Sequence, residues 1–129
     1  MNVYLSVPMI ANRALERARL MAKAITDSGH TIASPWVLGP LETSKSGGAD
    51  VFQRDKKAAE ESDTIVADVT EPSIGVGMEL MAAYIAGKKI VLVAKRGRAV
   101  SRMLAQMDRK ETVEYDSEDD IYRVLRRLL

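Results

Sequence analysis

The sequence contains no cysteine and only one histidine, His30. Without thiols the chain can form neither disulfides nor thiolate metal sites, and it has no cysteine nucleophile. A single histidine argues against a metal site built from imidazole ligands. We therefore expect no metal, and the candidate residues described below require no organic cofactor.

Long apolar runs and a strong charge bias are also missing. No stretch approaches the roughly 20 apolar residues of a membrane span. The N-terminal MNVYLSVPM lacks the basic start and long apolar run of a signal peptide. Lys and Arg number 19 against 18 Asp and Glu, which leaves a formal net charge of +1. So weak a bias gives no reason to expect nucleic acid or an anionic membrane as a partner. We expect a cytoplasmic protein.

What the chain does contain is 47% apolar and 29% charged residues, a balance typical of globular proteins. Its length suits one domain, residues 1–129. Strand-like and helix-like apolar patterns alternate along it. The expected strands are 2–8, 30–34, 64–69, 89–94 and 112–115. Helices are expected after Asn12, at 50–62, at 75–86, near 101–107 and at 117–129. This alternation predicts a three-layer αβα sandwich with a five-stranded parallel sheet, flavodoxin-like or Rossmann-like.

Several residues predict where helices begin and end. Asn12 is expected to cap the first helix, and Gly29 to end it. Ser117 and Asp120 resemble a capping pair at the start of the last helix. Residues 35–49 form the longest irregular stretch, and such long loops are often functional.

In sheets of this kind, ligands bind beyond the carboxyl ends of the strands, near the point where strand order reverses. Three loops are expected to converge there, namely residues 6–12, 69–78 and 94–102. The sequence therefore predicts one crevice shared by Tyr4 to Pro8, Ser73 to Glu79, and Ser101.

The segment TEPSIGVGMEL, residues 70–80, carries the strongest candidate for chemistry. Its glycines allow a ligand close to a helix N-terminus that favours an anion, although a tight strand-to-helix turn explains them equally well. Glu79 is expected in the first helical turn, where an acid ordinarily stabilises the helix dipole and faces solvent. The helix is apolar nearly all round, however, which favours a buried catalytic carboxylate at the crevice.

A second carboxylate and an aromatic residue are weaker candidates. Asp55 lies on the same side of its predicted helix as Val51 and Ala59. Two convergent carboxylates would suit glycosidic cleavage, one at the anomeric carbon and the other managing a proton. Trp36, the only tryptophan, is either core or a wall of the site that stacks on a base. The basic loop KRGRAVSR, residues 95–102, is either a solvated loop or, through Ser101, a phosphate site.

Three segments together resemble the nucleoside 2-deoxyribosyltransferase superfamily, and especially its 2′-deoxynucleoside 5′-phosphate N-hydrolase branch. They are VYLSVPM, FQRDKKAAEESDTIVADVTEPSIGVGMEL and GKKIVLVAKRGRAVSRML, which follow one another over almost the whole chain. The resemblance implies a five-stranded parallel sheet between helices and a homodimer. It also implies hydrolysis of deoxynucleoside monophosphates to a free base and 2-deoxyribose 5-phosphate.

The resemblance also assigns roles to residues. Glu79 takes the place of the family nucleophile, and Asp55 that of the aspartate which assists departure of the base. Ser73 and Ser101 match serines that bind the 5′-phosphate, the second of them contributed by the partner subunit. Tyr4 matches a tyrosine that lines the site. The expected substrate-binding residues are Tyr4, Leu5, Ser6, Val7, Pro8, Met9, Trp36, Ser73, Gly75, Gly77, Ser101, Arg102 and Met103.

The loop after the first strand departs from the family pattern. Val7 and Pro8 stand where the phosphohydrolase branch has glycine and serine, and the place of its arginine falls near Ile10. Arg13 is a candidate substitute. A deoxyribosyltransferase that passes the sugar to another base therefore stays open as an alternative. So does a nucleotide-binding module without turnover, because fold alone does not separate these functions.

Overall fold

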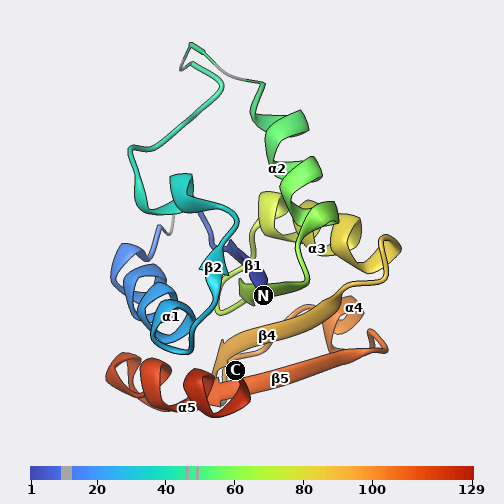
Figure 1. Cartoon of the computed structure of the whole chain (residues 1–129). Helices are drawn as coiled ribbons and strands as arrows, with labels where there is room; N and C mark the ends of the chain where they lie inside the picture. Colours follow the sequence, from blue (N-terminus) through green and yellow to red (C-terminus); the bar gives the residue numbers. More distant parts are fainter. Residues whose placement is uncertain (10–12, 46, 49) are drawn as a thin grey trace.

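The computed structural model describes residues 1–9, 13–45, 47–48 and 50–129. Five parallel strands form one sheet in the order β2-β1-β3-β4-β5. The strands are β1 (Asn2–Ser6), β2 (Thr31–Ile32), β3 (Thr64–Asp68), β4 (Lys89–Lys95) and β5 (Lys110–Tyr115) (Figure 1). This is the flavodoxin-like strand order, so the predicted parallel α/β fold is confirmed.

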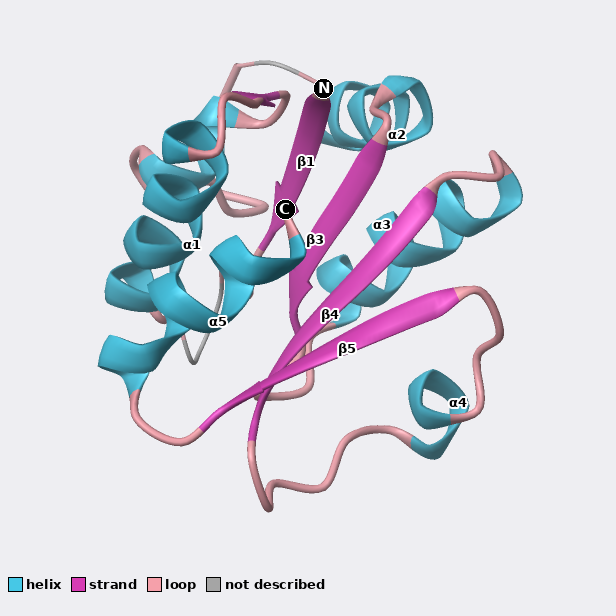
Figure 2. Ribbon diagram, turned by 60° about the horizontal axis from the view of Figure 1, so that its bottom comes forward, coloured by secondary structure: helices cyan, strands magenta, loops and turns pink. Residues whose placement is uncertain are grey.

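Helices cover both faces of the sheet, as Figure 2 shows. Helices α1 (Leu15–Asp27) and α5 (Ile121–Leu128) pack together on one face, and α2 (Val51–Glu61) and α3 (Ile74–Ile85) pack together on the other. Three shorter helices complete the described chain: η1 (Pro35–Leu38), α4 (Arg102–Ala105) and η2 (Glu118–Asp120). The three predicted layers are therefore present.

Strand geometry decides which side chains can reach a site on either face. Successive side chains of a strand point to opposite faces of the sheet. On β1, Val3 and Leu5 belong to the core beneath α1 and α5, whereas Tyr4 belongs to the core beneath α2 and α3. Tyr4 and Ser6 are therefore directed toward α2 and α3. All five residues of β3 are buried, as expected for a strand covered on both faces.

Strand β2 is shorter than predicted, because the Ser34 side chain replaces part of its backbone pairing with β1. Ser34 Oγ accepts a hydrogen bond from the Leu5 amide (2.9 Å) and donates one to the Leu5 carbonyl (2.8 Å). These bonds satisfy the edge of β1 where a longer β2 would otherwise pair. The strand expected at 30–34 is thus reduced to Thr31–Ile32.

Helix ends follow the sequence in part. Gly29 has a φ of +85°, which glycine adopts without strain, and it lies just beyond the end of α1 as predicted. Ser117 and Asp120 form the expected capping box, which opens η2 rather than an α-helix. The predicted cap Asn12 lies outside the described residues, and α1 begins after Ala14 without a side-chain cap.

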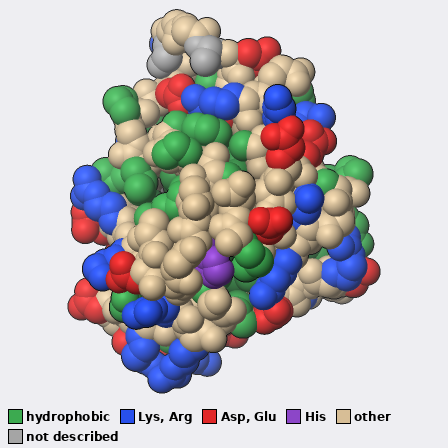
Figure 3. Space-filling view, viewed as in Figure 1, with side chains coloured by type: hydrophobic (Ala, Val, Ile, Leu, Met, Phe, Trp, Pro, Cys, Tyr) green, Lys and Arg blue, Asp and Glu red, His purple; other side chains and the backbone are tan. Residues whose placement is uncertain are grey.

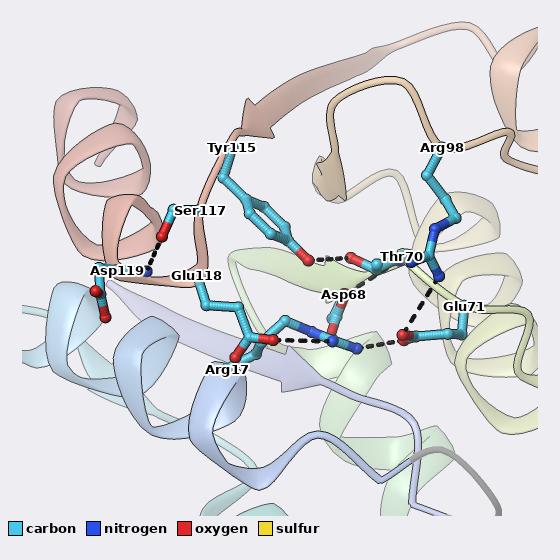
Figure 4. Close-up of polar contacts among 9 residues, drawn as sticks. All are labelled: Arg17, Asp68, Thr70, Glu71, Arg98, Tyr115, Ser117, Glu118 and Asp119. Carbon is cyan, nitrogen blue, oxygen red and sulfur yellow. Dashed lines mark hydrogen bonds and ion pairs between the residues drawn. The ribbon is translucent and has the colours of Figure 1, made fainter.

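A partly buried ion-pair network joins the carboxyl-end loops of β3, β4 and β5 to α1, as Figure 4 shows. Arg17 donates from Nε to Asp68 Oδ2 (2.8 Å) and from Nη2 to Glu71, and Arg98 Nη1 lies 3.6 Å from the other oxygen of Glu71. Nearby, the Thr70 and Tyr115 hydroxyls are 2.8 Å apart. Arg17 and Asp68 are buried, and removing Arg17 would leave the Asp68 carboxylate buried without its charged partner. The network fixes the loop that leads into α3.

The surface in Figure 3 carries charges of both signs, in keeping with the small net charge. Basic side chains gather at the end formed by α5, which carries Arg123, Arg126 and Arg127. Within the part of the chain that the structure describes, no helix combines the length and apolar character that crossing a bilayer requires.

Candidate active site

The candidate site lies where the strand order reverses. From β1 the chain moves outward to β2 and then returns to the other side of β1 to form β3. The loops beyond the carboxyl ends of β1 and β3 therefore diverge and leave a crevice between them. Glu79 reaches this crevice from α3, the helix that follows β3. It lies in the second turn of α3, not in the first turn as the sequence suggested.

Two hydroxyl groups from β1 hold the Glu79 carboxylate. Ser6 Oγ donates a hydrogen bond to Oε1 (2.7 Å), and the Tyr4 hydroxyl donates one to Oε2. Tyr4 and Ser6 are both fully buried. Both oxygens of Glu79 therefore have a fixed orientation, set by the alternation of side chains along β1.

Burial dominates the electrostatics of this carboxyl group. Desolvation raises the pKa of Glu79 from 4.5 to about 7, with the nearby charge of Asp55 adding to the rise. The hydrogen bonds from Tyr4 and Ser6 act in the opposite direction because they favour the ionised form. Burial, together with the charge of Glu79, also raises the pKa of Tyr4, which keeps the phenol protonated as a donor.

Asp55 approaches Glu79 from α2, as the sequence predicted. Its side chain is 21% exposed, and its Oδ1 accepts a hydrogen bond from Arg54 Nε (2.8 Å). Arg54 also forms a fork to Glu42, with distances of 2.9 and 3.1 Å. Two carboxyl groups thus converge on one site from two different helices.

Glu79 and Asp55 line a cavity of about 450 Å³. Ser73, the N-cap of α3, contributes to the same cavity, and its Oγ accepts a hydrogen bond from the Val76 amide (3.3 Å). An anion held here would meet the N-terminus of α3. The other described residues around the cavity are Val7, Met9, Trp36, Val37, Glu42, Val51, Arg54, Pro72, Ile74, Gly75 and Val76.

Glycine at the start of α3 leaves room at the cavity. A Cβ added at Gly75 would meet no atom within 4 Å, and Gly75 lines the cavity. A methyl group there would therefore project into open space that a ligand could use. Gly77 has the same freedom, but it lines a different cavity.

The predicted single crevice is wrong in one respect. Ser101 and Met103 line a second cavity of about 440 Å³, together with Gly77, and Glu79 is not among its lining residues. Ser73 borders both cavities. Within one chain, the loop after β4 thus lies on the other side of the start of α3. Arg102 is exposed and lines neither cavity.

Of the other predicted binding residues, some line the Glu79 cavity and others do not. Leu5 does not reach the site, because its side chain lies in the core beneath α1 and both its backbone groups bind Ser34. Pro8 is buried and does not line the Glu79 cavity. Val7 and Met9 do line it. Arg13 turns away to donate to the Val37 and Gly39 carbonyls, so the suggested substitute for the family arginine is engaged elsewhere.

Trp36 lines the cavity, but its indole ring is already partly covered. The Arg54 guanidinium lies 4.2 Å from the ring centroid, and the Tyr4 ring meets the indole edge-on at 6.4 Å. A base cannot stack on the ring face that Arg54 covers. The expected stacking role is therefore limited to the remainder of the indole.

Helix α3 is less buried in the single chain than its apolar sequence predicted. Its outward side carries Ile74 (87% exposed), Met78 (53%), Met81 (37%) and Ile85 (78%). These residues follow one another at helical spacing and form an apolar stripe next to the site. Phe52 of α2 is 54% exposed and borders the groove between α2 and α3 together with Met78 and Met81.

Two residues near the site were not predicted from the sequence. Arg54 and Glu42 both line the cavity, and Arg54 binds Asp55 directly. The position of Arg54 next to Asp55 was a usable signal, since a cation adjacent to a functional carboxylate can hold it. Glu42 lies in the irregular stretch, where spacing carries no comparable signal.

Comparison with known proteins identifies the family, although no protein-family model matches the chain. The chain is 34% identical over 109 residues to a Thermofilum pendens protein provisionally named 2′-deoxynucleoside 5′-phosphate N-hydrolase 1, covering 81% of this chain and 76% of that one. It is 30% identical over 121 residues to the 5-hydroxymethyl-dUMP N-hydrolase of Mus musculus, covering 90% of this chain and 68% of that one. The chain belongs to the 2′-deoxynucleoside 5′-phosphate N-hydrolase family. It is accordingly an N-glycosidase.

Solved structures place this N-hydrolase in the deoxyribosyltransferase-like fold. The Clostridium botulinum CMP N-glycosidase superposes with a TM-score of 0.74 at 17% identity over the whole of both chains. The 2-deoxyribosyltransferase of Bacillus psychrosaccharolyticus superposes with a TM-score of 0.67 at 21% identity, covering 95% of this chain and 90% of that one. At these identities the likeness concerns the fold alone.

The raised pKa of Glu79 predicts a pH-dependent cost to stability. The native pKa of about 7 lies above the ordinary value of 4.5, so the native state binds the proton more tightly and loses stability as pH rises between these values. We expect Glu79→Gln to raise the free energy of unfolding at pH 8 by roughly 1–3 kcal/mol and to raise it much less at pH 5. Urea unfolding at both pH values measures this difference.

Glu61→Gln is the matched control, because the Glu61 side chain is 65% exposed and only distantly paired with Lys57. That variant should leave the stability difference between the two pH values unchanged. A Glu79→Gln protein that is no more stable than wild type at pH 8 would contradict the electrostatic description of the site.

Proposed function

We propose that the protein hydrolyses the N-glycosidic bond of 2′-deoxynucleoside 5′-monophosphates, with Glu79 as the nucleophile. The observation that carries the proposal is the Glu79 carboxylate at the switch point, held by Tyr4 and Ser6 in a cavity shared with Asp55. Names of relatives support the substrate class, because they include deoxynucleoside 5′-phosphate and hydroxymethyl-dUMP hydrolases.

The proposed reaction proceeds in two displacements. Glu79 attacks C1′ from the face opposite the base, the C1′–N bond breaks, and its electron pair stays on the base nitrogen. Asp55 delivers a proton to the departing base. Water then attacks C1′, the sugar–Glu79 ester bond breaks, and Asp55 accepts the water proton. The product sugar leaves as 2-deoxyribose 5-phosphate, and the enzyme regains its starting protonation.

The proposed assignment requires one proton on the carboxyl pair and one negative charge on Glu79. Burial, with the nearby charge of Asp55, raises the pKa of Glu79 to about 7, so the site holds a proton through part of the neutral pH range. The hydrogen bonds donated by Tyr4 and Ser6 stabilise the negative charge that Glu79 carries as the nucleophile.

The 5′-phosphate is proposed to bind at the N-terminus of α3, near Ser73. Among the described residues, this end of the cavity has no counterpart of the family arginine, since Val7 and Pro8 follow β1 and Arg13 binds the Val37 and Gly39 carbonyls. That observation favours the deoxyribosyltransferase as the second candidate, because such an enzyme has no phosphate to hold.

Base release from a panel of substrates separates these functions. The panel comprises deoxynucleoside monophosphates, unphosphorylated deoxynucleosides and ribonucleotides, each with and without a free acceptor base. We expect release from the deoxynucleoside monophosphates, its loss in Glu79→Gln, and a decrease in kcat of about 100-fold or more in Asp55→Asn. Exchange onto the acceptor base would instead identify a transferase. Nucleotide binding without any turnover would identify the protein as a binding module.

We also propose that the enzyme works as a homodimer in which Ser101, Arg102 and Met103 of one subunit complete the site of the other. Within one chain, Ser101 and Met103 border a cavity that excludes Glu79, yet Met103 is 71% exposed. The apolar stripe of α3, formed by Ile74, Met78, Met81 and Ile85, runs beside the site and is uncovered in the single chain. A second copy on this stripe would bury it and bring in the missing phosphate ligand.

Complementation between two inactive variants tests the shared site. Glu79→Gln removes the nucleophile, and Ser101→Asp places a negative charge where the phosphate should bind. If each site combines Glu79 of one subunit with Ser101 of the other, a mixed dimer formed by co-expression has one site that carries neither substitution. We expect about half of wild-type activity from that dimer. Light scattering should give twice the 14.2 kDa mass of one chain. A monomer, or a mixed dimer as inactive as its parents, would contradict the proposal.

A further inference from the structure

Arg54 is the most densely connected charged side chain at the site, and the two-carboxylate chemistry leaves it without a role. Its three guanidinium nitrogens are all engaged, with Nε on Asp55 and Nη1 and Nη2 on Glu42. Its flat face lies 4.2 Å from the Trp36 ring centroid. The side chain is only 25% exposed. Contacts to all three nitrogens and to one flat face fix both the position and the orientation of the guanidinium group.

The contacts of Arg54 join three separate segments of the chain. Asp55 belongs to α2, Trp36 to η1, and Glu42 to the irregular stretch that follows η1. All four side chains line the Glu79 cavity. Arg54 therefore links one wall of the cavity to the carboxylate that is proposed to handle the proton.

The bond to Asp55 has a specific geometric consequence. Arg54 Nε occupies Oδ1 of Asp55, and the carboxylate can then rotate only with loss of this 2.8 Å bond. Glu42 and Trp36 in turn prevent Arg54 from moving with it. The hydrogen bond from Arg54 lowers the pKa of Glu42, so the fork keeps its ionic partner to a lower pH than an ordinary glutamate would.

We propose that Arg54 is a positioning residue for the reaction. Glu42 and Trp36 hold Arg54 in place, and Arg54 orients Asp55 toward the base that departs from C1′ of the substrate. This inference rests on the proposed N-glycosidase mechanism and adds a residue to it. Arg54 is not proposed to touch the reacting atoms, because each of its three nitrogens already donates to a carboxylate. Its contribution appears only through Asp55.

Steady-state kinetics of Arg54→Gln test this role. A misdirected Asp55 slows departure of the base but leaves sugar and phosphate binding intact, so we expect kcat to fall roughly 10- to 100-fold. The KM should change by less than about 3-fold, which a general loss of the pocket would not produce. Glu42→Gln, which weakens the clamp but keeps Arg54, should give a smaller decrease in kcat.

A double-mutant cycle shows whether Arg54 acts through Asp55. In an Asp55→Asn background, Arg54→Gln should change kcat by less than about 2-fold, because there is no carboxylate left to orient. An undiminished effect in that background would overturn the proposal, and so would a single variant with wild-type kcat. A loss confined to KM would overturn it as well.

Arg109→Gln is the matched control, because the Arg109 guanidinium lies 4.3 Å from the Tyr84 ring centroid and Arg109 does not line the Glu79 cavity. It removes an arginine stacked on an aromatic ring and should leave kcat unchanged. Thermal melting is recorded for every variant. If Arg54→Gln does not fold, the predicted decrease is tested with Arg54→Lys and Glu42→Gln, and wild-type kcat in both overturns the proposal.

The same assay separates this inference from the proposed function. A wild-type protein that releases no base from any nucleotide would overturn both. An active wild type with unimpaired Arg54→Gln would overturn the role of Arg54 alone.

Discussion

The site depends on a largely buried carboxylate that its surroundings both destabilise and hold in place. Desolvation raises the pKa of Glu79 to about 7, while hydroxyl groups of Tyr4 and Ser6 fix its two oxygens. An ordinary surface glutamate would be fully ionised and hydrated. The site therefore trades stability for a desolvated carboxylate, which suits the role proposed for Glu79 as the nucleophile.

Much of this arrangement follows from strand geometry. The parallel sheet creates a crevice where β1 and β3 diverge, and alternation along β1 sends Tyr4 and Ser6 to one side and Leu5 to the other. The network of Arg17 with Asp68 and Glu71 fixes the loop between β3 and α3, as Figure 4 shows. Fold and site are thus positioned by the same few elements.

The fold was predictable because the apolar runs of β3 and β4 are strong and alternate with helix-like segments. Glu79 stood out as the one acid of an apolar helix, whereas Asp55 lies on a charged helix and its proposed role came from the family resemblance. Details that depend on single side-chain contacts were not predictable. Ser34 shortens β2 by bonding Leu5, and no spacing in the sequence reveals such a bond. The apolar side of α3 was read as core, but it is exposed in the single chain, because an apolar helix looks the same in either case.

The central claim is that Glu79 forms a bond to the sugar, and the configuration of the product tests it most directly. Turnover of a deoxynucleoside monophosphate in water with added methanol would trap the sugar as a methyl glycoside, whose anomeric configuration NMR reports. Two displacements at C1′ predict the β-configuration of the substrate, with no product from Glu79→Gln. An α-glycoside from wild type would show direct attack by solvent and would contradict the role of Glu79 as the nucleophile.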